Sequence, residues 1–393
     1  MRRAVLHALL PAMLAGGAHA QSTSQSTSQS TPQSAPSGAG DTPQAEISGE
    51  PPPRGGPGIT YGGELDSKVQ LDGVLPRGSR GFAELYAKSI ATAYVNLGDA
   101  FTVRGEATYE RLRAQSSTTA FNGQGLYLSQ LYGSYNAGPV TLYGGKIHPR
   151  FSIGYDLAPG IYETYANDYE QKERIGAGVL VNVLPAYGRH VLSAEAYFVD
   201  TSVLSSSVFS RPGLDNASTL RPYRTRRSFG GAGNTGQPDN FDVALDGSRI
   251  PGLEKLRYHL GFSRQSVAQP GERVETGYTA ALSYEFRLSS RVFVTPVAEY
   301  AHLENFGGAA HDVRDYVLLG AEFTYRKWAL ALVAAPRRVQ APDAKTRWDH
   351  QLSTTLSYTL APRLVVSAGY NQLRDGPAVT NAVGTAVNYT LRF

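Results

Sequence analysis

The feature of this sequence that most constrains its fold is a series of alternating segments, each of about 9–14 residues, that starts near Ile59. In 278–286, for example, the even positions are apolar or aromatic and the odd positions are small or polar. Successive side chains of a β-strand point to opposite faces, so such a segment has one apolar and one polar face. The sequence ends within a segment of the same kind, VGTAVNYTLRF (383–393).

We count about sixteen such segments, and the connections between them alternate in length. Short turns such as Gly98-Asp99 and Ala361-Pro362 follow the even-numbered segments, whereas mostly longer, polar connections follow the odd-numbered ones. This parity predicts a sheet with turns at one end, loops at the other, and both ends of the sheet on the turn side. The predicted strands are 59–71, 82–97, 100–113, 124–136, 139–148, 171–183, 190–200, 241–248, 254–266, 273–288, 291–303, 313–325, 327–337, 346–360, 363–374 and 380–393.

A soluble β-sandwich or propeller also contains many alternating strands, but it fits this sequence less well. The predicted strands are long for a soluble protein, and no repeat of propeller length is visible. Aromatic residues also gather near the strand ends, as interfacial girdles do in membrane barrels. We therefore predict an all-β fold, a transmembrane antiparallel β-barrel of about sixteen strands with short periplasmic turns and long external loops, over residues 58–393.

The segments before the predicted barrel have a different composition. Residues 1–20 combine a basic start, a short apolar run and a small-residue end, which predicts a cleaved secretory signal peptide. Residues 21–57 are rich in Ser, Gln, Thr and Pro, which predicts a disordered linker. The absence of cysteine means that an exported chain must be stable without disulfides, and a net charge of +4 does not favour a nucleic-acid partner.

The signal sequence, the alternating strands, the turn parity and the terminal Tyr-Thr-Leu-Arg-Phe together resemble a Gram-negative outer-membrane porin. The resemblance implies a bacterial outer-membrane protein whose last strand is recognised by the barrel-assembly machinery, with Tyr389, Leu391 and Phe393 as the assembly signal. It also implies contact with outer-membrane lipid and lipopolysaccharide, and a homotrimer as a candidate assembly.

In porins, the loop at the position of 149–170 folds inward and narrows the channel. Here this loop carries four carboxylates and no Lys or Arg from Phe151 to Gln171, so it would place a negative field in the pore. An outward, solvated loop is the alternative. The predicted pore constriction comprises Asp156, Glu163, Asp168 and Glu170, and the predicted basic wall opposite comprises Lys68, Lys88, Arg104 and Lys146.

Other groups point less clearly to a site. Arg211, Arg221, Arg224, Arg226 and Arg227 form either an entry site for anions or lipid phosphates, or a solvated surface loop. The histidines of the predicted mature chain lack metal-ligand spacing, and no phosphate loop or nucleophile elbow is present, so no metal, cofactor or catalytic residue is predicted.

The sequence therefore predicts a porin through which small hydrophilic solutes and ions diffuse passively. The alternatives are a substrate-specific channel, an outer-membrane barrel hydrolase, or a structural protein of the envelope.

Overall fold

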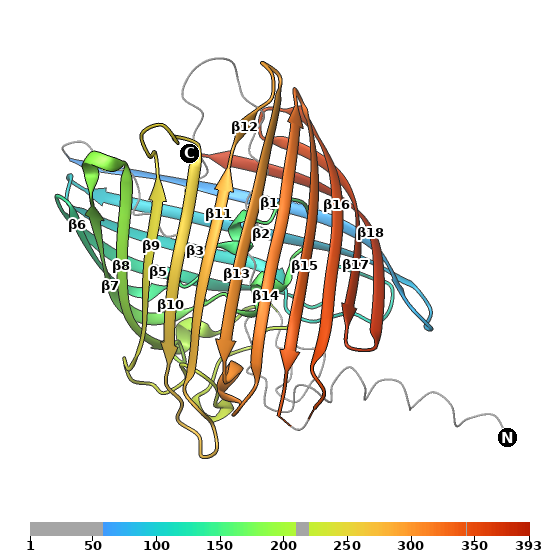
Figure 1. The fold of residues 1–393 in the computed structure, drawn as a ribbon, viewed down its shortest axis with the longest axis horizontal. Coiled ribbons are helices and arrows are strands. Elements are labelled where there is room, and N and C mark those ends of the chain that lie inside the picture. Colours follow the sequence, from blue (N-terminus) through green and yellow to red (C-terminus); the bar gives the residue numbers. More distant parts are fainter. Residues whose placement is uncertain (1–57, 210–219, 343) are drawn as a thin grey trace.

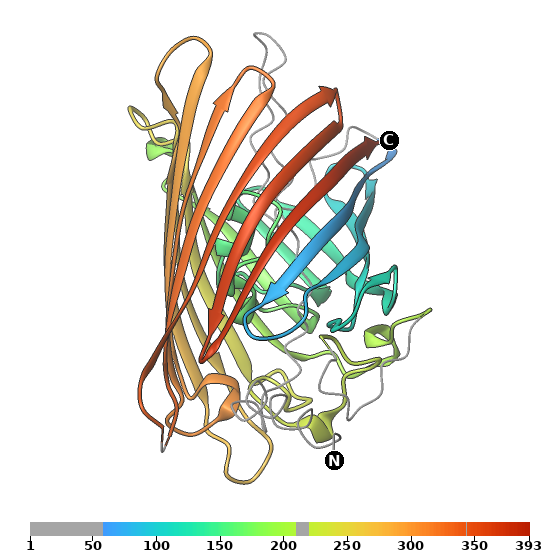
Figure 2. The same ribbon diagram turned by 90° about the vertical axis from the view of Figure 1, so that its right-hand side faces the viewer.

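The alternating segments form one sheet that closes on itself (Figures 1 and 2). The computed structural model describes residues 58–209, 220–342 and 344–393, so the predicted signal peptide, the linker and Arg211 lie outside the described residues. In the described part, the sheet has eighteen named strands, two of which span only two residues, leaving sixteen long strands. These are β1 (Ile59–Pro76), β2 (Phe82–Leu97), β3 (Phe101–Arg111), β5 (Gln124–Ala137), β6 (Val140–Ile147), β7 (Arg174–Val183), β8 (Arg189–Val199), β9 (Asn240–Ser248), β10 (Leu256–Gln265), β11 (Glu275–Tyr284), β13 (Val292–Glu304), β14 (Val313–Tyr325), β15 (Trp328–Gln340), β16 (Arg347–Ala361), β17 (Leu364–Asp375) and β18 (Ala378–Arg392).

The remaining elements are short. β12 (Phe286–Arg287) continues the line of β11 and pairs with β13, and β4 (Thr119–Ala120) lies parallel to β2. Single helical turns occur in the connections: α1 (Gly154–Leu157), η2 (Tyr165–Asp168), η3 (Pro185–Tyr187), η4 (Val203–Ser205), η5 (Arg227–Phe229) and η6 (Phe306–Gly308). None of the helices in the described residues is long and apolar enough to cross a membrane.

The barrel closes where β1 pairs with β18, in a register that runs from Glu64↔Arg392 to Pro76↔Thr380. The backbones of Gly63 and Phe393 also exchange two hydrogen bonds, of 2.9 and 3.1 Å. Closure leaves no open sheet edge, so every long strand has a partner on both sides. The sequence-based prediction of a closed barrel of sixteen strands is confirmed, and the soluble sandwich and propeller are excluded.

The two faces of the wall differ as the alternation predicts. On β18, Val383, Val387 and Tyr389 are exposed on the outside, whereas Ala386 and Asn388 are buried on the inside. Long apolar side chains are exposed around the outer surface, and polar and charged side chains are buried within. This distribution is typical of a transmembrane barrel.

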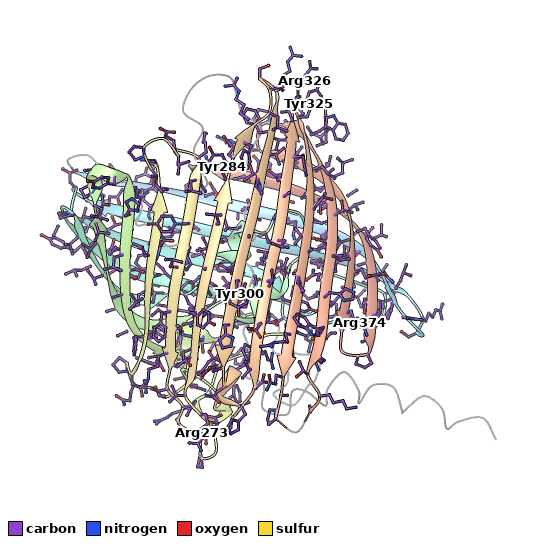
Figure 3. All side chains as sticks on the ribbon, viewed as in Figure 1. Arg273, Tyr284, Tyr300, Tyr325, Arg326 and Arg374 are labelled. Atoms are coloured by element: carbon purple, nitrogen blue, oxygen red, sulfur yellow. The ribbon has the colours of Figure 1, made fainter. Side chains whose placement is uncertain are left out.

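Aromatic residues of the outer face are exposed toward both ends of the strands. Figure 3 shows Tyr284 and Tyr325 toward the end with the short turns, and Arg273 and Arg374 toward the end with the longer loops. Trp328 pairs with Tyr325 and also with Tyr358, whose ring centroid lies 4.6 Å from its own. Such a cluster suits an interfacial girdle.

Candidate functional site: the loop inside the barrel

The connection between β6 and β7, residues 148–173, turns into the barrel, and we call it the inserted loop. Its backbone and side chains reach strands on the far side of the lumen. The Ile153 amide donates to Glu299 on β13 (3.0 Å), the Ile161 amide to Thr355 on β16 (3.2 Å), and the Tyr165 hydroxyl to the Arg374 carbonyl on β17 (2.8 Å). Its single turn α1 lies within the ring of strands in both ribbon views (Figures 1 and 2). The loop therefore faces inward.

Glycines on the inner wall leave the space that the inserted loop occupies. A Cβ atom at Gly261 would overlap the Phe151 carbonyl oxygen, and one at Gly369 would lie 3.1 Å from the Tyr162 ring. The loop therefore packs directly against the sheet backbone, where any side chain would displace it. We call these residues the glycine seat: Gly261, Gly277, Gly320, Gly369 and Gly384.

Hydrogen bonds then fix the loop on this seat. Glu299 is buried and accepts from both the Ile153 amide and the Tyr169 hydroxyl, the latter at 2.7 Å. The Phe151 carbonyl accepts from Thr279 at 2.5 Å and from His259 at 3.0 Å. These hydrogen bonds are shielded from water, which strengthens them, and together they hold the loop in a single position on the wall.

The four predicted constriction acids have different surroundings. Glu163 lies 3.6 Å from Lys88 and keeps 41% of its side chain exposed. Asp168 forms an ion pair of 2.7 Å with Arg337 on β15 and is 16% exposed. Glu170 is buried against Lys172 of the same loop, and Asp156 lies close enough to interact with it electrostatically. Of the three acids in ion pairs, Glu163 is the most accessible to a solute.

The predicted basic wall divides into two parts. Lys68 donates to the Ile161 carbonyl (3.1 Å), and Lys88 lies between Glu110 and Glu163, at 3.6 Å from each. These two lysines bring β1 and β2 to the inserted loop. Arg104 lies on the inner face of β3, 3.9 Å from Glu106.

Lys146 has a different position. It is buried at the root of the loop, 2.8 Å from both Glu173 and Asp200. The preceding Gly145 has φ of 140°, which interrupts the alternation of β6. The structure thus brings Lys68 and Lys88 to the inserted loop, and places Lys146 in a separate ion cluster at its root.

Sequence reasoning missed the Arg337 cluster. Arg337 bonds Asp168, Asp349 (2.7 Å) and Asp375 (3.0 Å), and its guanidinium carbon lies 4.1 Å from the centre of the Tyr165 ring. These residues are far apart in sequence, and Arg337 sits where the alternation of its strand ends in two arginines. The cluster ties the inserted loop to β15, β16 and β17.

Burial shifts the acid–base behaviour of the loop. Burial raises the pKa of Glu170 to about 8, against the attraction of Lys172. Arg221 and Lys146, by contrast, hold the pKa of Glu173 at about 2, although burial alone would raise it. Burial lowers the pKa of His148 to about 4. At neutral pH, Glu173 is ionised and His148 is neutral, whereas Glu170 titrates close to this pH.

In the connection between β8 and β9, which carries the predicted arginine group, some arginines form internal contacts and others are exposed. Arg221 is buried, pairs with Glu173 at 2.7 Å and stacks on Tyr127, while Arg224 donates to the Thr201 carbonyl. Arg226 and Arg227 are exposed. The described residues contain no cluster of His, Asp or Glu that could hold a metal ion.

The terminal strand carries the predicted assembly signal on its outer face. Tyr389 and Phe393 are exposed, and the Phe393 ring lies over Gly63, where a Cβ atom would come within 2.6 Å of it. Leu391 is half-buried and pairs with Leu65.

Comparison with solved structures places this architecture among outer-membrane channels. The outer membrane channel DcaP of Acinetobacter baumannii has 13% sequence identity and a TM-score of 0.53, over 85% of this chain and 97% of that one. OprB of Pseudomonas putida has 10% identity and a TM-score of 0.60, over 84% and 94%. OmpF of Salmonella typhi, solved with daunomycin, has 10% identity and a TM-score of 0.58, over 85% and 97%.

The fold is therefore that of the porin-type barrels of the outer membrane. Comparison with protein-family models and with curated protein sequences gave no match.

Proposed function

We propose that the protein is an outer-membrane porin, through which small hydrophilic solutes and ions diffuse without chemical turnover. The observation that carries the proposal is the inserted loop. A wide barrel with an apolar outer face is partly filled by one loop, which is fixed to one side and presents Glu163 to the lysines of the other. Size and charge at this loop would then select solutes.

Planar-bilayer recording of the purified full-length protein tests the proposal. We expect ohmic steps whose size scales with salt concentration, and a reversal potential in a salt gradient that shifts when Asp156, Glu163, Asp168 and Glu170 are neutralised together. No conductance steps would contradict the channel. An unchanged reversal potential would remove the loop acids from the filter.

The first alternative is a substrate-specific channel, which the same recordings distinguish. A specific channel binds its solute, so the flux saturates and the solute blocks the ion current. Large steps that no solute blocks would favour general diffusion.

The second alternative is a barrel hydrolase, which needs an activated nucleophile. In the described residues, His190, His259 and His302 make their side-chain hydrogen bonds to tyrosine, carboxylate or backbone carbonyl groups. None of these bonds joins a histidine to a serine. This favours a channel without catalysis.

We further propose that residues 1–20 direct export, that outer-membrane lipid and lipopolysaccharide surround the barrel, and that Tyr389, Leu391 and Phe393 guide insertion by the barrel-assembly machinery. Deleting Phe393 should lower the amount of folded barrel in the membrane and leave the conductance of each folded barrel unchanged. Heat-modifiable migration on gels measures the first quantity and bilayer recording the second. Crosslinking in native membranes tests the homotrimer.

A further inference from the structure

His259 on β10 is fully buried, and both of its ring nitrogens have a partner. Nδ1 lies 2.8 Å from Oδ1 of Asp246 on β9, and Nε2 lies 3.0 Å from the carbonyl oxygen of Phe151 in the inserted loop. The ring therefore connects the barrel wall to the root of the loop, directly beside Gly261 of the glycine seat.

Both partners of the ring are hydrogen-bond acceptors. A backbone carbonyl has no proton to donate. Arg150 holds Asp246 as a carboxylate, through contacts of 2.5 and 3.2 Å to Oδ2. A neutral imidazole carries only one N–H, so it satisfies only one of these two acceptors. Hydrogen bonds from both nitrogens need a proton on each, so this arrangement points to a protonated, cationic His259.

The groups around His259 are arranged to hold this charge. Asp246 faces it from β9, Glu299 interacts with it electrostatically from β13, and Thr279 on β11 shares the Phe151 carbonyl. The other cation nearby is Arg150 of the loop, whose amide donates to Glu195 on β8 at 3.1 Å. Asp246 therefore lies between the two cations, with one carboxylate oxygen toward each.

We propose that His259 is a positioning residue for the inserted loop, and that the proton it carries latches the root of the loop to the barrel wall. When the proton leaves, the neutral ring can donate to only one of its two partners, so the hydrogen bond to Oδ1 of Asp246 or the one to the Phe151 carbonyl is lost, and the link between the wall and the loop root weakens. Alkaline pH would thus loosen the loop and change the current. The effect on current rests on the proposed channel function, whereas the latch itself does not.

Nitrogen NMR of the full-length protein, labelled with ¹⁵N-histidine in detergent micelles, tests the charge directly. We expect one imidazole with both nitrogens protonated at pH 7, absent from the H259Q variant. The matched control is H302Q, because His302 also bonds an aspartate at 2.8 Å (Asp315) but stacks on the exposed Tyr278, on the outer face. A neutral His259 at pH 7 would overturn the latch, whether or not the protein conducts.

Bilayer recording from pH 5 to 10 then tests the consequence. In the wild type and in H302Q, we expect the open-channel current to become noisier and its level to change at alkaline pH. H259Q should show the alkaline behaviour at every pH, because glutamine cannot carry the proton. The same pH response in H259Q as in the wild type would overturn the latch. A protein that never conducts would contradict the channel and leave the NMR result to decide the latch.

Discussion

The two sides of the lumen hold the inserted loop in different ways. Between β10 and β18, the inner wall carries the glycine seat, and the loop lies on the backbone itself. On β1 and β2, the inner wall carries long charged side chains, and only their ends reach the loop, as Lys68 and Lys88 do. One side therefore sets the position of the loop by close packing, whereas the other sets the charge that faces it.

The largest expected effect, on stability, comes from removing Arg337, which ties the inserted loop to the glycine-lined side of the wall. In R337M, Asp168 and the fully buried Asp349 lose their main partner, and breaking a buried ion pair costs about 3–5 kcal/mol. We expect a clear drop in the thermal unfolding midpoint, measured by circular dichroism in detergent. R392M is the control, because its pair with Glu64 is exposed and contributes about 0–1 kcal/mol. Equal drops in both variants would contradict this role of Arg337.

A smaller effect is expected from filling the glycine seat. In G261A, the new methyl group overlaps the Phe151 carbonyl, and such overpacking costs about 1–3 kcal/mol. The loop should leave its seat, so the conductance level should change. G105A is the matched control, because its Cβ would meet only Leu131, at 3.8 Å. Identical conductance in G261A and the wild type would show that the seat does not position the loop.

On the charged side, neutralising an acid should change the ion selectivity of the channel and hardly change the stability of the barrel. In E163Q, the exposed carboxylate next to Lys88 becomes neutral, so the cation preference should fall, with a stability change of about 0–1 kcal/mol. The reversal potential in a salt gradient measures this preference. E285Q removes an acid paired with Lys255, far from the loop, and should leave the reversal potential unchanged. A shift of equal size in E285Q would refute a local filter.

The smallest effect is a pH dependence of selectivity. Because the pKa of Glu170 is raised to about 8, this carboxyl is mostly neutral at pH 6.5 and mostly ionised at pH 9.5. The loop therefore becomes more negative as the pH rises, and cation preference should increase over this range. E170Q should lose this increase but retain any change in current that comes from His259. A decrease in cation preference with rising pH would contradict the assignment.

The strands were predictable because the alternation of side chains survives at almost every position. All sixteen long strands match a predicted segment, and two of the larger differences in their bounds occur where charge interrupts the apolar pattern. β15 runs to Gln340 instead of 337, because the pair Arg337 and Arg338 ends the apolar alternation, although Arg337 points into the lumen. β1 runs to Pro76 instead of 71, through the inward-facing Asp72.

The site was predictable only in part, because its contacts join residues that are distant in sequence. The inward position of the loop was predicted from the resemblance to porins, through its place in the order of strands. The glycine seat does not, since Gly261, Gly320 and Gly384 lie on three different strands and face the same loop only when the sheet curls. His259 likewise reads as an ordinary wall residue until Asp246 and Phe151 are placed on either side of it.

The pairing of β1 with β18 also determines the order of events during biogenesis. The strand that begins the barrel can acquire its second neighbour only after the last residues of the chain have been synthesised. Until then, the chain exposes two unpaired strand edges and its lipid-facing side chains, a state that aggregates readily in water. We therefore expect the insertion of the strands and the closing of the hydrogen-bond ring to occur together.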